Sequence, residues 1–531
     1  MIRRLRPWAA LALVLTVAPA ARAQTPDARP LWIAITAPAL FETIGPLAQC
    51  RSAQGFDIQI LDDAKLRTDA QRAARNVGPL RSAIRSAIDA PGSDRRREVF
   101  VVLAGFEPAA ARIDAARKPF ALPAGNGSAA NMASVPSDAV VADLDGDDRP
   151  DVMIGRLPAR DGGQLAQMIA KIVRFESQSA PAPWQHRFVL MAGAPNYGRV
   201  VDALLESMVI RGLNAMDGRW LGQVFYNNAA SRLGCDQARL LPALRRALGE
   251  GAALTVYTGH SNAQGFYLGA ADFAAVKTPV GGGPFVALSC YGGVQDGRTP
   301  AGGDGFAVVA MRNPDGPVAT FAAAQVSHPY CNKMLLEGLA HSMLNGAAPE
   351  RPLTVGRVVA HMHKALATAD YSRFLWAALN QADGTDHTFD EQRRGHLQMY
   401  SLFGDPATRW PTRTTAMKLS APTVTRAGAT LRLTGELVDA NLADARLVVS
   451  IRQDWTALTA GGTVGPSTED LQVAGCEARV ENGRFEVELP LPARLRPAGL
   501  EAHLVARIWA IGADGAQAVA ARCIELRDTE H

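Results

Sequence analysis

Three absences narrow what this chain can be. After residue 23, no stretch approaches the roughly 18 uninterrupted apolar residues that a membrane-spanning helix needs, which argues against an integral helical membrane protein. The net charge is only +4 and no dense basic cluster appears, so we expect no nucleic-acid partner. The spacing of the 6 cysteines matches no structural metal site.

The first 23 residues have the composition of a secretory signal. Arg3, Arg4 and Arg6 form a positive segment, Trp8–Val17 an apolar core, and Ala21–Ala23 a small-residue cleavage site. We therefore expect an exported, soluble mature chain without a membrane span, periplasmic or extracellular in a bacterium. No cysteine follows the cleavage site, which argues against a lipid anchor there.

Residues 31–412 alternate strand-like and helix-like segments, a pattern that predicts an α/β fold with a mostly parallel sheet. Amphipathic patterns predict helices at Asp161–Glu176, with Asp161 as the cap, and at Asp236–Leu248. A Pro-rich run at 179–183 divides an N-terminal sub-domain (24–183) from a second one (184–414). The predicted strands are Trp32–Ala37, Phe56–Leu61, Val99–Ala104, Phe188–Ala192, Ala252–Thr258, Phe285–Ser289 and Val318–Ala322.

The region 415–531 has a different character, because short alternating strands and turn-rich segments replace the helical patterns. This pattern predicts a β-sandwich, which we expect to be immunoglobulin-like. Cys476 and Cys523 lie alone in this region, and an exported protein meets an oxidising compartment, so this pair is the most favoured disulfide.

His260 and Cys290 carry the chemistry that the sequence suggests most strongly. Each closes a buried-strand pattern, in Ala252–Ser261 and in Pro284–Gly293. Because reactive side chains collect beyond the carboxyl ends of parallel strands, the two residues can meet in one crevice. A thiolate is a nucleophile and an imidazole activates it, so the pair suits covalent catalysis; a buried inert cysteine and an unrelated histidine are the alternative.

The segments around these two residues resemble the His and Cys motifs of the gingipain-type cysteine peptidases, secreted relatives of caspases, legumains and separases. Leu31–Pro38 and Pro46–Phe56 resemble the opening strand and helix of that family, Asp151–Pro158 its "IGR-P" segment, and Tyr400–Pro406 its closing "GDP" stretch. The resemblance spans about residues 31 to 412. It implies a caspase-like α/β unit that cleaves peptides or proteins, followed by an immunoglobulin-like module.

The resemblance also assigns roles at the site. It implies Cys290 as nucleophile, His260 as acid and base, and the backbone N–H groups of Ser261 and Cys290 as the oxyanion hole. It places the substrate pocket at His328, Gly259 and Tyr291.

The sequence departs from the family pattern at two substituted positions and in one segment that lacks an expected acid. Ser261 and Ser289 stand where the family favours Gly and Ala. No carboxylate occupies the segment 193–198, where the archetypes place the acid that orients the histidine, so we expect a Cys–His dyad with Asn196 as a weaker candidate partner. Asp202 and Glu206 are predicted to be exposed helix charges, and cleavage after Arg is therefore not implied.

Asp143, Asp145, Asp147 and Asp151 form a second motif with chemistry. Carboxylates at relative positions 1, 3, 5 and 9, with a glycine in the turn, can converge on one Ca²⁺ ion, because this ion takes about six to eight oxygen ligands. The alternative is a solvated acidic turn. Four like charges repel without a counter-ion, so we predict a structural calcium loop.

Two further classes of function stay open. A catalytically inactive gingipain-like binding or scaffold protein would explain the changes at Ser261 and Ser289, and a peptidase-fold transpeptidase would share the same acyl-enzyme. His361 and His363 lie two apart on a predicted helix and make a poor metal pair, and Asp405 reads as a turn residue.

Overall fold

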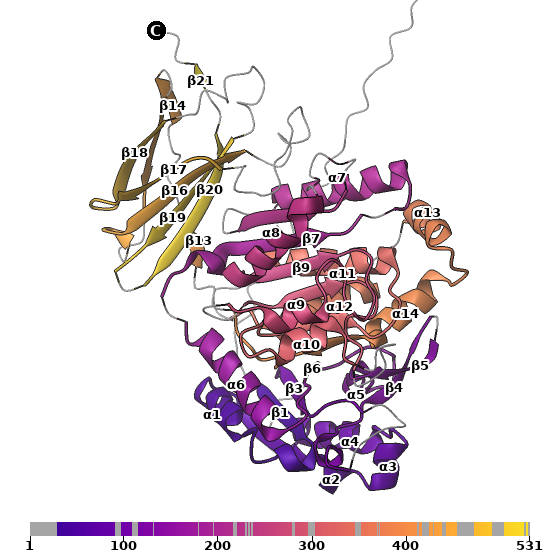
Figure 1. Ribbon diagram of the computed structural model, residues 1–531. Helices are drawn as coiled ribbons and strands as arrows, with labels where there is room; N and C mark the ends of the chain where they lie inside the picture. Colours follow the sequence, from indigo (N-terminus) through magenta and orange to yellow (C-terminus); the bar gives the residue numbers. More distant parts are fainter. Residues whose placement is uncertain are drawn as a thin grey trace, which may run out of the picture.

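The computed structural model describes most of residues 29–528 (Figure 1). The ranges left out are 1–28, 91–96, 109–114, 216–219, 296–302, 346–351, 417–423, 454–471, 491–503 and 529–531, with shorter breaks elsewhere. The predicted signal sequence therefore lies outside the described residues. None of the described helices is long and apolar enough to cross a membrane.

A ten-stranded sheet forms the centre of the molecule, with the strand order β2-β1-β3-β6-β12-β11-β10-β9-β7-β8. All seven strands predicted from the sequence belong to it, with small shifts at their ends, whereas β6, β8 and β12 were not predicted as strands. The strands are β1 (Leu31–Thr36), β2 (Asp57–Asp62), β3 (Val99–Ala104), β6 (Met153–Leu157), β7 (Arg187–Ala192), β8 (Leu221–Tyr226), β9 (Leu254–Thr258), β10 (Phe285–Leu288), β11 (Thr320–Ala323) and β12 (Tyr400–Phe403).

The sheet consists of two parallel halves that run in opposite directions. β2, β1, β3, β6 and β12 are mutually parallel, and β11, β10, β9, β7 and β8 are mutually parallel. β12 and β11 are antiparallel, so the two halves meet there. The carboxyl ends of the second half therefore lie along the same edge as the amino ends of the first.

Helices cover both faces of this sheet, as its buried strands require. The predicted helix at 161–176 is confirmed as α6, and the Asp161 carboxylate caps it by accepting the Gln164 N–H at 2.8 Å. The helices are α1 (Gly45–Ala53), α2 (Asp63–Leu66), α3 (Asp69–Ala73), α4 (Gly78–Ile88), α5 (Ala139–Ala142), α6 (Gly162–Glu176), α7 (Arg199–Ala215), α8 (Gln237–Glu250), α9 (Ala270–Ala275), α10 (Phe306–Arg312), α11 (Pro329–Asn345), α12 (Val355–Thr368), α13 (Arg373–Asp383) and α14 (Phe389–Met399).

The two family-like motifs at Asp151–Pro158 and Tyr400–Pro406 meet where β6 and β12 lie side by side. A Cβ atom on Gly155 would come within 2.4 Å of the Gly404 carbonyl oxygen, so this close approach requires glycine. Next to it, the buried guanidinium of Arg156 donates to both carboxylate oxygens of Asp138 at 2.8 and 2.6 Å. These motifs join the halves of the sheet and supply no catalytic group.

Asp405 begins a turn, as predicted, and it is also a buried anchor. Its carboxylate accepts hydrogen bonds from Trp32 Nε1 at 3.1 Å and from Arg51 Nε at 2.7 Å, and it also accepts the Ala407 N–H. Asp405 and Glu176 raise the pKa of Arg51, although burial opposes them. Asp405 thus links β1 and α1 to the end of β12.

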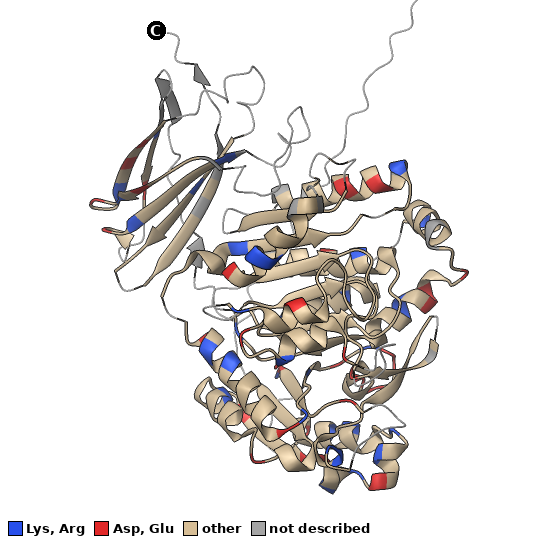
Figure 2. Ribbon diagram, in the orientation of Figure 1, with Lys and Arg blue, Asp and Glu red and all other residues tan. Residues whose placement is uncertain are grey.

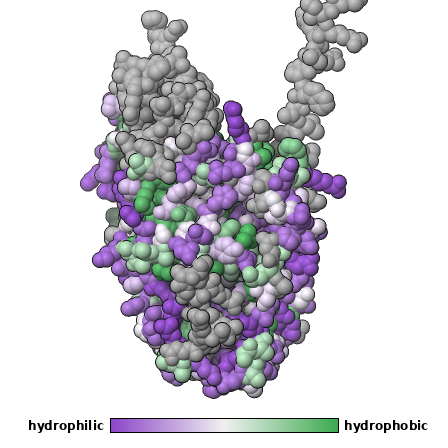
Figure 3. Space-filling view, turned by 45° about the vertical axis from the view of Figure 1, so that its right-hand side comes forward, coloured by the Kyte–Doolittle hydropathy of each residue, from purple (hydrophilic) through white to green (hydrophobic). Residues whose placement is uncertain are grey.

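Basic and acidic residues are interspersed along the described elements, as the colouring of the ribbon in Figure 2 shows. Figure 3 shows small apolar areas set among hydrophilic residues on one face. This distribution agrees with the small net charge of the sequence.

Residues 414–528 contain a five-stranded sheet (β13-β20-β19-β16-β17) and a four-stranded sheet (β18-β15-β14-β21). Side chains of both sheets, for example Val449 and Ile508 of the first and Leu433 and Val487 of the second, belong to one hydrophobic cluster. The immunoglobulin-like topology stays a prediction. The strands are β13 (Thr414–Ala416), β14 (Val424–Ala427), β15 (Thr430–Glu436), β16 (Arg446–Gln453), β17 (Gln472–Arg479), β18 (Arg484–Pro490), β19 (Leu504–Ile511), β20 (Gln517–Ile524) and β21 (Arg527–Asp528).

The predicted Cys476–Cys523 disulfide is wrong. Cys476 lies in β17 and is unpaired, whereas Cys523 lies in β20, with β16 and β19 between these strands. Three strand spacings separate the two backbones by about 14 Å. A disulfide needs Cα atoms within about 7 Å of each other, so the sheet order forbids the bond.

A buried polar cluster attaches the C-terminal sheets to the unit built around the ten-stranded sheet. The His186 and Trp509 rings meet edge to face at 4.8 Å. The Gln517 Oε1 atom accepts from Trp509 Nε1 at 3.0 Å and lies 3.1 Å from His186 Nε2. Because His186 directly precedes β7, this contact links the C-terminal sheets to the beginning of that strand.

Candidate active site

The ends of β9 and β10 bring His260 and Cys290 to one edge of the sheet. Thr258 of β9 and Leu288 of β10 are paired in register. His260 lies two residues after Thr258, and Cys290 lies two residues after Leu288. Parallel neighbours lie about 4.8 Å apart, so the two residues leave the sheet at the same level on adjacent strands. Both line one cavity.

The turn after β9 fixes the backbone of His260. Gly259 has φ +142°, and a Cβ atom there would lie 2.9 Å from Gly193 N, so the position requires glycine. The Tyr257 hydroxyl donates to the His260 carbonyl at 2.5 Å. The Tyr197 ring lies 5.7 Å from the exposed His260 imidazole, a neighbour that the sequence did not reveal.

A polar chain lies behind the half-buried Cys290 sulfur. The Ser327 N–H donates to Cys290 Sγ at 3.4 Å. The Ser327 hydroxyl in turn accepts from Asn332 Nδ2 at 2.8 Å, and the Tyr400 hydroxyl donates to Asn332 Oδ1 at 2.6 Å. An N–H group directed at sulfur favours the thiolate, which is the reactive form.

Ser261 and Tyr291 shape the turn that presents Cys290. The Ser261 hydroxyl donates to the Cys290 carbonyl at 2.6 Å and so connects the His turn to the Cys turn. The backbone of Ser261 is outside the left-handed region, so its side chain costs no backbone strain there. Tyr291 does adopt φ +60°, which makes the bend directly after Cys290 a tight one.

The segment after β7 differs from its prediction in three side chains. Asn196 is exposed with φ +59°, and the ring that lies against His260 belongs to its neighbour Tyr197. Asp202 is not a simple exposed charge, because its half-buried carboxylate accepts the Tyr197 N–H at 3.0 Å. Glu206 is half-buried as well and lines the cavity.

Of the three predicted pocket residues, Gly259 lines the cavity and two lie elsewhere. His328 is buried, with its ring 4.5 Å from that of Trp376. Burial lowers the pKa of His328 to about 4, and its backbone N–H donates to His396 Nε2 at 2.8 Å. Tyr291 is turned by its left-handed backbone and is not among the residues that line the cavity. His328 therefore belongs to the core, and its neighbour Ser327 contacts the sulfur.

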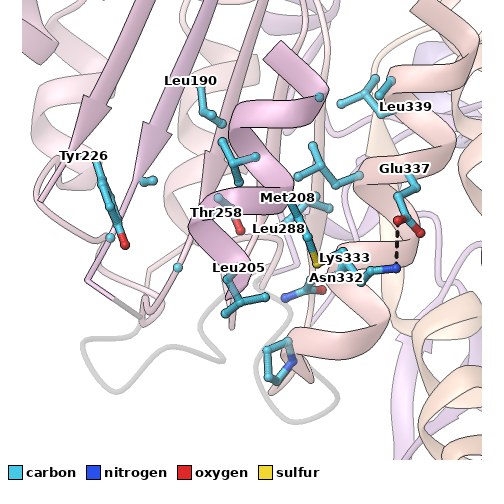
Figure 4. Close-up of a pocket in the computed structure, with 18 of the residues that line it drawn as sticks. Leu190, Leu205, Met208, Tyr226, Thr258, Leu288, Asn332, Lys333, Glu337 and Leu339 are labelled. Carbon is cyan, nitrogen blue, oxygen red and sulfur yellow. Dashed lines mark ion pairs between the residues drawn. The ribbon is translucent and has the colours of Figure 1, made fainter. Parts of the chain in front are cut away.

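The cavity itself has a volume of about 290 Å³ and lies between the sheet and two helices, α7 and α11 (Figure 4). Leu190 and Leu288 contribute from strands, Leu205 and Met208 from α7, and Leu339 from α11. At one end it reaches His260 and Cys290. No sequence pattern indicated it, because its walls come from segments spread over residues 188–343.

The acidic loop brings three of its four predicted ligands together. Carboxylate oxygens of Asp143, Asp145 and Asp151 lie within 4.8 Å of one another, which suits a hard cation. Asp147 is outside this group, and its carboxylate accepts the Arg149 N–H at 2.9 Å. Several of the oxygens already accept backbone hydrogen bonds, as Asp151 does from Leu144 and Asp145.

A thiol and an imidazole on adjacent parallel strand ends, in a helix-covered sheet, define the class of α/β cysteine peptidase folds. The chain belongs to peptidase family C25, whose family model matches residues 25–411. No curated protein matches the chain.

Two solved structures show the same fold. The Arg-specific cysteine proteinase gingipain R is 14% identical, with a TM-score of 0.52 and coverage of 94% of this chain and 99% of that one. A complex of the pro- and mature domains of RgpB from Porphyromonas gingivalis is 14% identical, with a TM-score of 0.51 and coverage of 93% and 100%. At such identity, the similarity concerns the fold.

Proposed function

We propose that the protein is an exported cysteine endopeptidase in which Cys290 and His260 act as a catalytic dyad. The observation that carries this proposal is the common register of the two residues on adjacent strand ends, at the mouth of one cavity. Membership of peptidase family C25 supports it independently. The leader-like first 23 residues support export.

The proposed reaction is acyl transfer in two steps. The Cys290 thiolate attacks the peptide carbonyl carbon while His260 holds the thiol proton, and that proton passes to the leaving amine as the C–N bond breaks. Water then attacks the thioester, gives a proton to His260, and releases the acid and the thiol. The N–H groups of Ser261 and Cys290 are the proposed donors to the oxyanion.

Labelling with a peptidyl acyloxymethyl ketone at neutral pH tests the nucleophile. We expect rapid modification of the wild type at Cys290, and neither modification nor peptide hydrolysis in Cys290→Ala. Cys50→Ala is the matched control, because burial raises the pKa of that half-buried thiol and so lowers its share of reactive thiolate. Equal labelling of wild type and Cys290→Ala would refute the assignment.

Two other functions fit the same fold. The departures at Ser261 and Ser289 favour an inactive binding or scaffold protein, which would not label. A transpeptidase would label but would also transfer the acyl group to an added amine, giving a mixed product that a peptidase gives only weakly. Hydrolysis without that product supports the peptidase.

Two structural proposals accompany the catalytic one. Asp143, Asp145 and Asp151 would hold a structural Ca²⁺ ion, supported by the approach of their oxygens. The two C-terminal sheets would form an immunoglobulin-like sandwich, supported by their shared hydrophobic cluster.

A further inference from the structure

The cavity beside Cys290 is longer than the catalytic pair needs. Its walls include Phe188 and Ala192 at the two ends of the β7 segment, and Leu254 and Thr258 at the two ends of β9. Four residue steps along a strand correspond to about 13 Å. The cavity therefore starts at the strand ends and continues under α7 and α11 along the face of the sheet (Figure 4).

The walls of this space are mostly apolar. Large hydrophobic side chains line it from strands β7 and β10 and from helices α7 and α11, among them Leu190, Leu205, Met208, Leu288, Leu336 and Leu339. An apolar wall favours an apolar ligand, because each Å² of apolar surface that the ligand buries is favourable by about 25 cal/mol and no polar group is left unpaired.

The charged side chains that line the cavity do not form a binding site for a cation inside it. Lys333 and Glu337 pair with each other at 2.7 Å along α11, as Figure 4 shows. Glu206 of α7 is the other acidic residue of the lining. A guanidinium or ammonium group would have to lose its water along the leucine walls for one half-buried carboxylate.

We propose that this cavity binds a bulky apolar side chain, such as that of Phe, Leu or Met, of the residue whose carbonyl Cys290 attacks. The proposal rests on the peptidase function proposed above and adds its substrate class. The size agrees, since an apolar cavity of about 150 Å³ accommodates benzene, and this one measures about 290 Å³. The inference places cleavage after large hydrophobic residues.

A set of acyloxymethyl ketones that share one peptide and differ only in the residue next to the reactive group tests this specificity. With Phe, Leu, Ala or Arg there, we expect the Phe and Leu probes to label Cys290 at least about tenfold faster than the Ala and Arg probes. Fastest labelling by Arg, or equal rates for all four, would overturn the inference while leaving the nucleophile in place. Absence of labelling by every probe would overturn the proposed function itself.

Two substitutions connect the preference to the cavity. Ala340 lines it from α11, whereas Ala203 is exposed on α7 and does not. Ala340→Phe should lower the rate of the Phe probe at least about tenfold and leave the Ala probe within about twofold. Ala203→Phe, the matched control, should change neither rate.

Two further variants address the possibility that Ala340→Phe misfolds and the possibility that the cavity binds a cation. If Ala340→Phe does not fold, Met208→Ala should enlarge the cavity and shift the preference from Leu towards the larger Phe. In Glu206→Gln, the Phe and Leu probes should still label Cys290 faster than the Arg probe does. A Glu206→Gln variant that instead loses a wild-type preference for Arg would show a cation site and overturn the proposal.

Discussion

Ser289 precedes the proposed nucleophile and carries a buried hydroxyl. Its side chain is inaccessible, and no group among the described residues forms a hydrogen bond with its Oγ atom. An unsatisfied buried hydroxyl costs about 1–3 kcal/mol. Ser289→Ala should therefore increase the free energy of unfolding by about 1 kcal/mol and leave the labelling rate of Cys290 unchanged. Denaturant unfolding and labelling check the two outcomes, and a less stable or unreactive variant would contradict this reading.

Asn332 acts on Cys290 through Ser327, because its amide binds the Ser327 hydroxyl while the Ser327 N–H approaches the sulfur. Asn332→Ala should loosen this arrangement and slow the reaction of Cys290 with iodoacetamide by about threefold to tenfold. Iodoacetamide is small and makes no use of the apolar cavity, so its rate reports on the sulfur alone. Ser342→Ala, on the same helix and distant from the sulfur, serves as control; an unchanged Asn332→Ala rate would mean that the polar chain has no influence on the thiol.

The residues that sequence reasoning missed share a physical cause. Ser327, Asn332 and Tyr197 gain their roles from contacts that folding creates between separate segments, and nothing in their local sequence marks them. The proximity of His260 and Cys290 at adjacent strand ends could be predicted, because a reactive side chain at the end of a buried strand is a local pattern. His328 was predicted to line the pocket, but it is buried and its neighbour Ser327 contacts the sulfur. Which of two successive residues faces the site depends on the path of the backbone after β11, and the sequence does not reveal that path.

At the scale of elements, strands with a clear apolar run or alternation were predictable, even the four-residue strands β10 and β11, and strands without such a pattern were not. β8 contains Gly222 and Gln223, and β12 has four residues directly after α14, so neither shows a clear period. The antiparallel meeting of β11 and β12 was also hidden, because strand direction depends on long-range connections.

The acidic loop before β6 gives a prediction at this scale. Added Ca²⁺ should raise the thermal midpoint and EDTA should lower it, with a gain of about 2.7 kcal/mol at a hundredfold excess over Kd. Asp145→Ala should remove most of the response, because Asp145 belongs to the converging group. Asp147→Ala, outside that group, should retain more of it. Identical melting with and without Ca²⁺ in the wild type would identify the loop as an acidic turn.

The buried histidine of α14 predicts how stability depends on pH. His396 Nδ1 lies 2.6 Å from the Gln392 carbonyl, and its Nε2 accepts the His328 N–H, so the ring is neutral with both nitrogens in use. Burial lowers its pKa to about 3. The unfolded chain therefore binds this proton first, and stability should decrease as the pH falls from about 6.5 towards 3. His396→Gln should be less stable at pH 7 but lose less stability over that interval; equal losses would contradict this origin.

At the scale of the whole molecule, the C-terminal sheets contact the α/β unit through His186 without lining its cavity. All residues that line the cavity lie between 188 and 343. A chain that ends at Thr414 should therefore melt at a lower temperature, because it lacks Gln517 and Trp509, yet still react at Cys290. Gln517→Ala in the full chain should lower the midpoint by a smaller amount. A soluble truncated chain that fails to react would make the C-terminal sheets part of the catalytic machinery.

The central position of β12 has a consequence for the order in which the molecule is built. Its residues, Tyr400–Phe403, are made after every other strand of the ten-stranded sheet, yet they lie between β6 and β11. Four strands of the first half (β2, β1, β3 and β6) can form as residues 31–157 emerge, and the second half as residues 187–323 emerge, because each group uses contacts near in sequence. The two halves stay unjoined until β12 arrives, and Tyr400 then reaches Asn332 behind the sulfur. The polar chain behind the Cys290 sulfur is therefore completed only when the two halves of the sheet join.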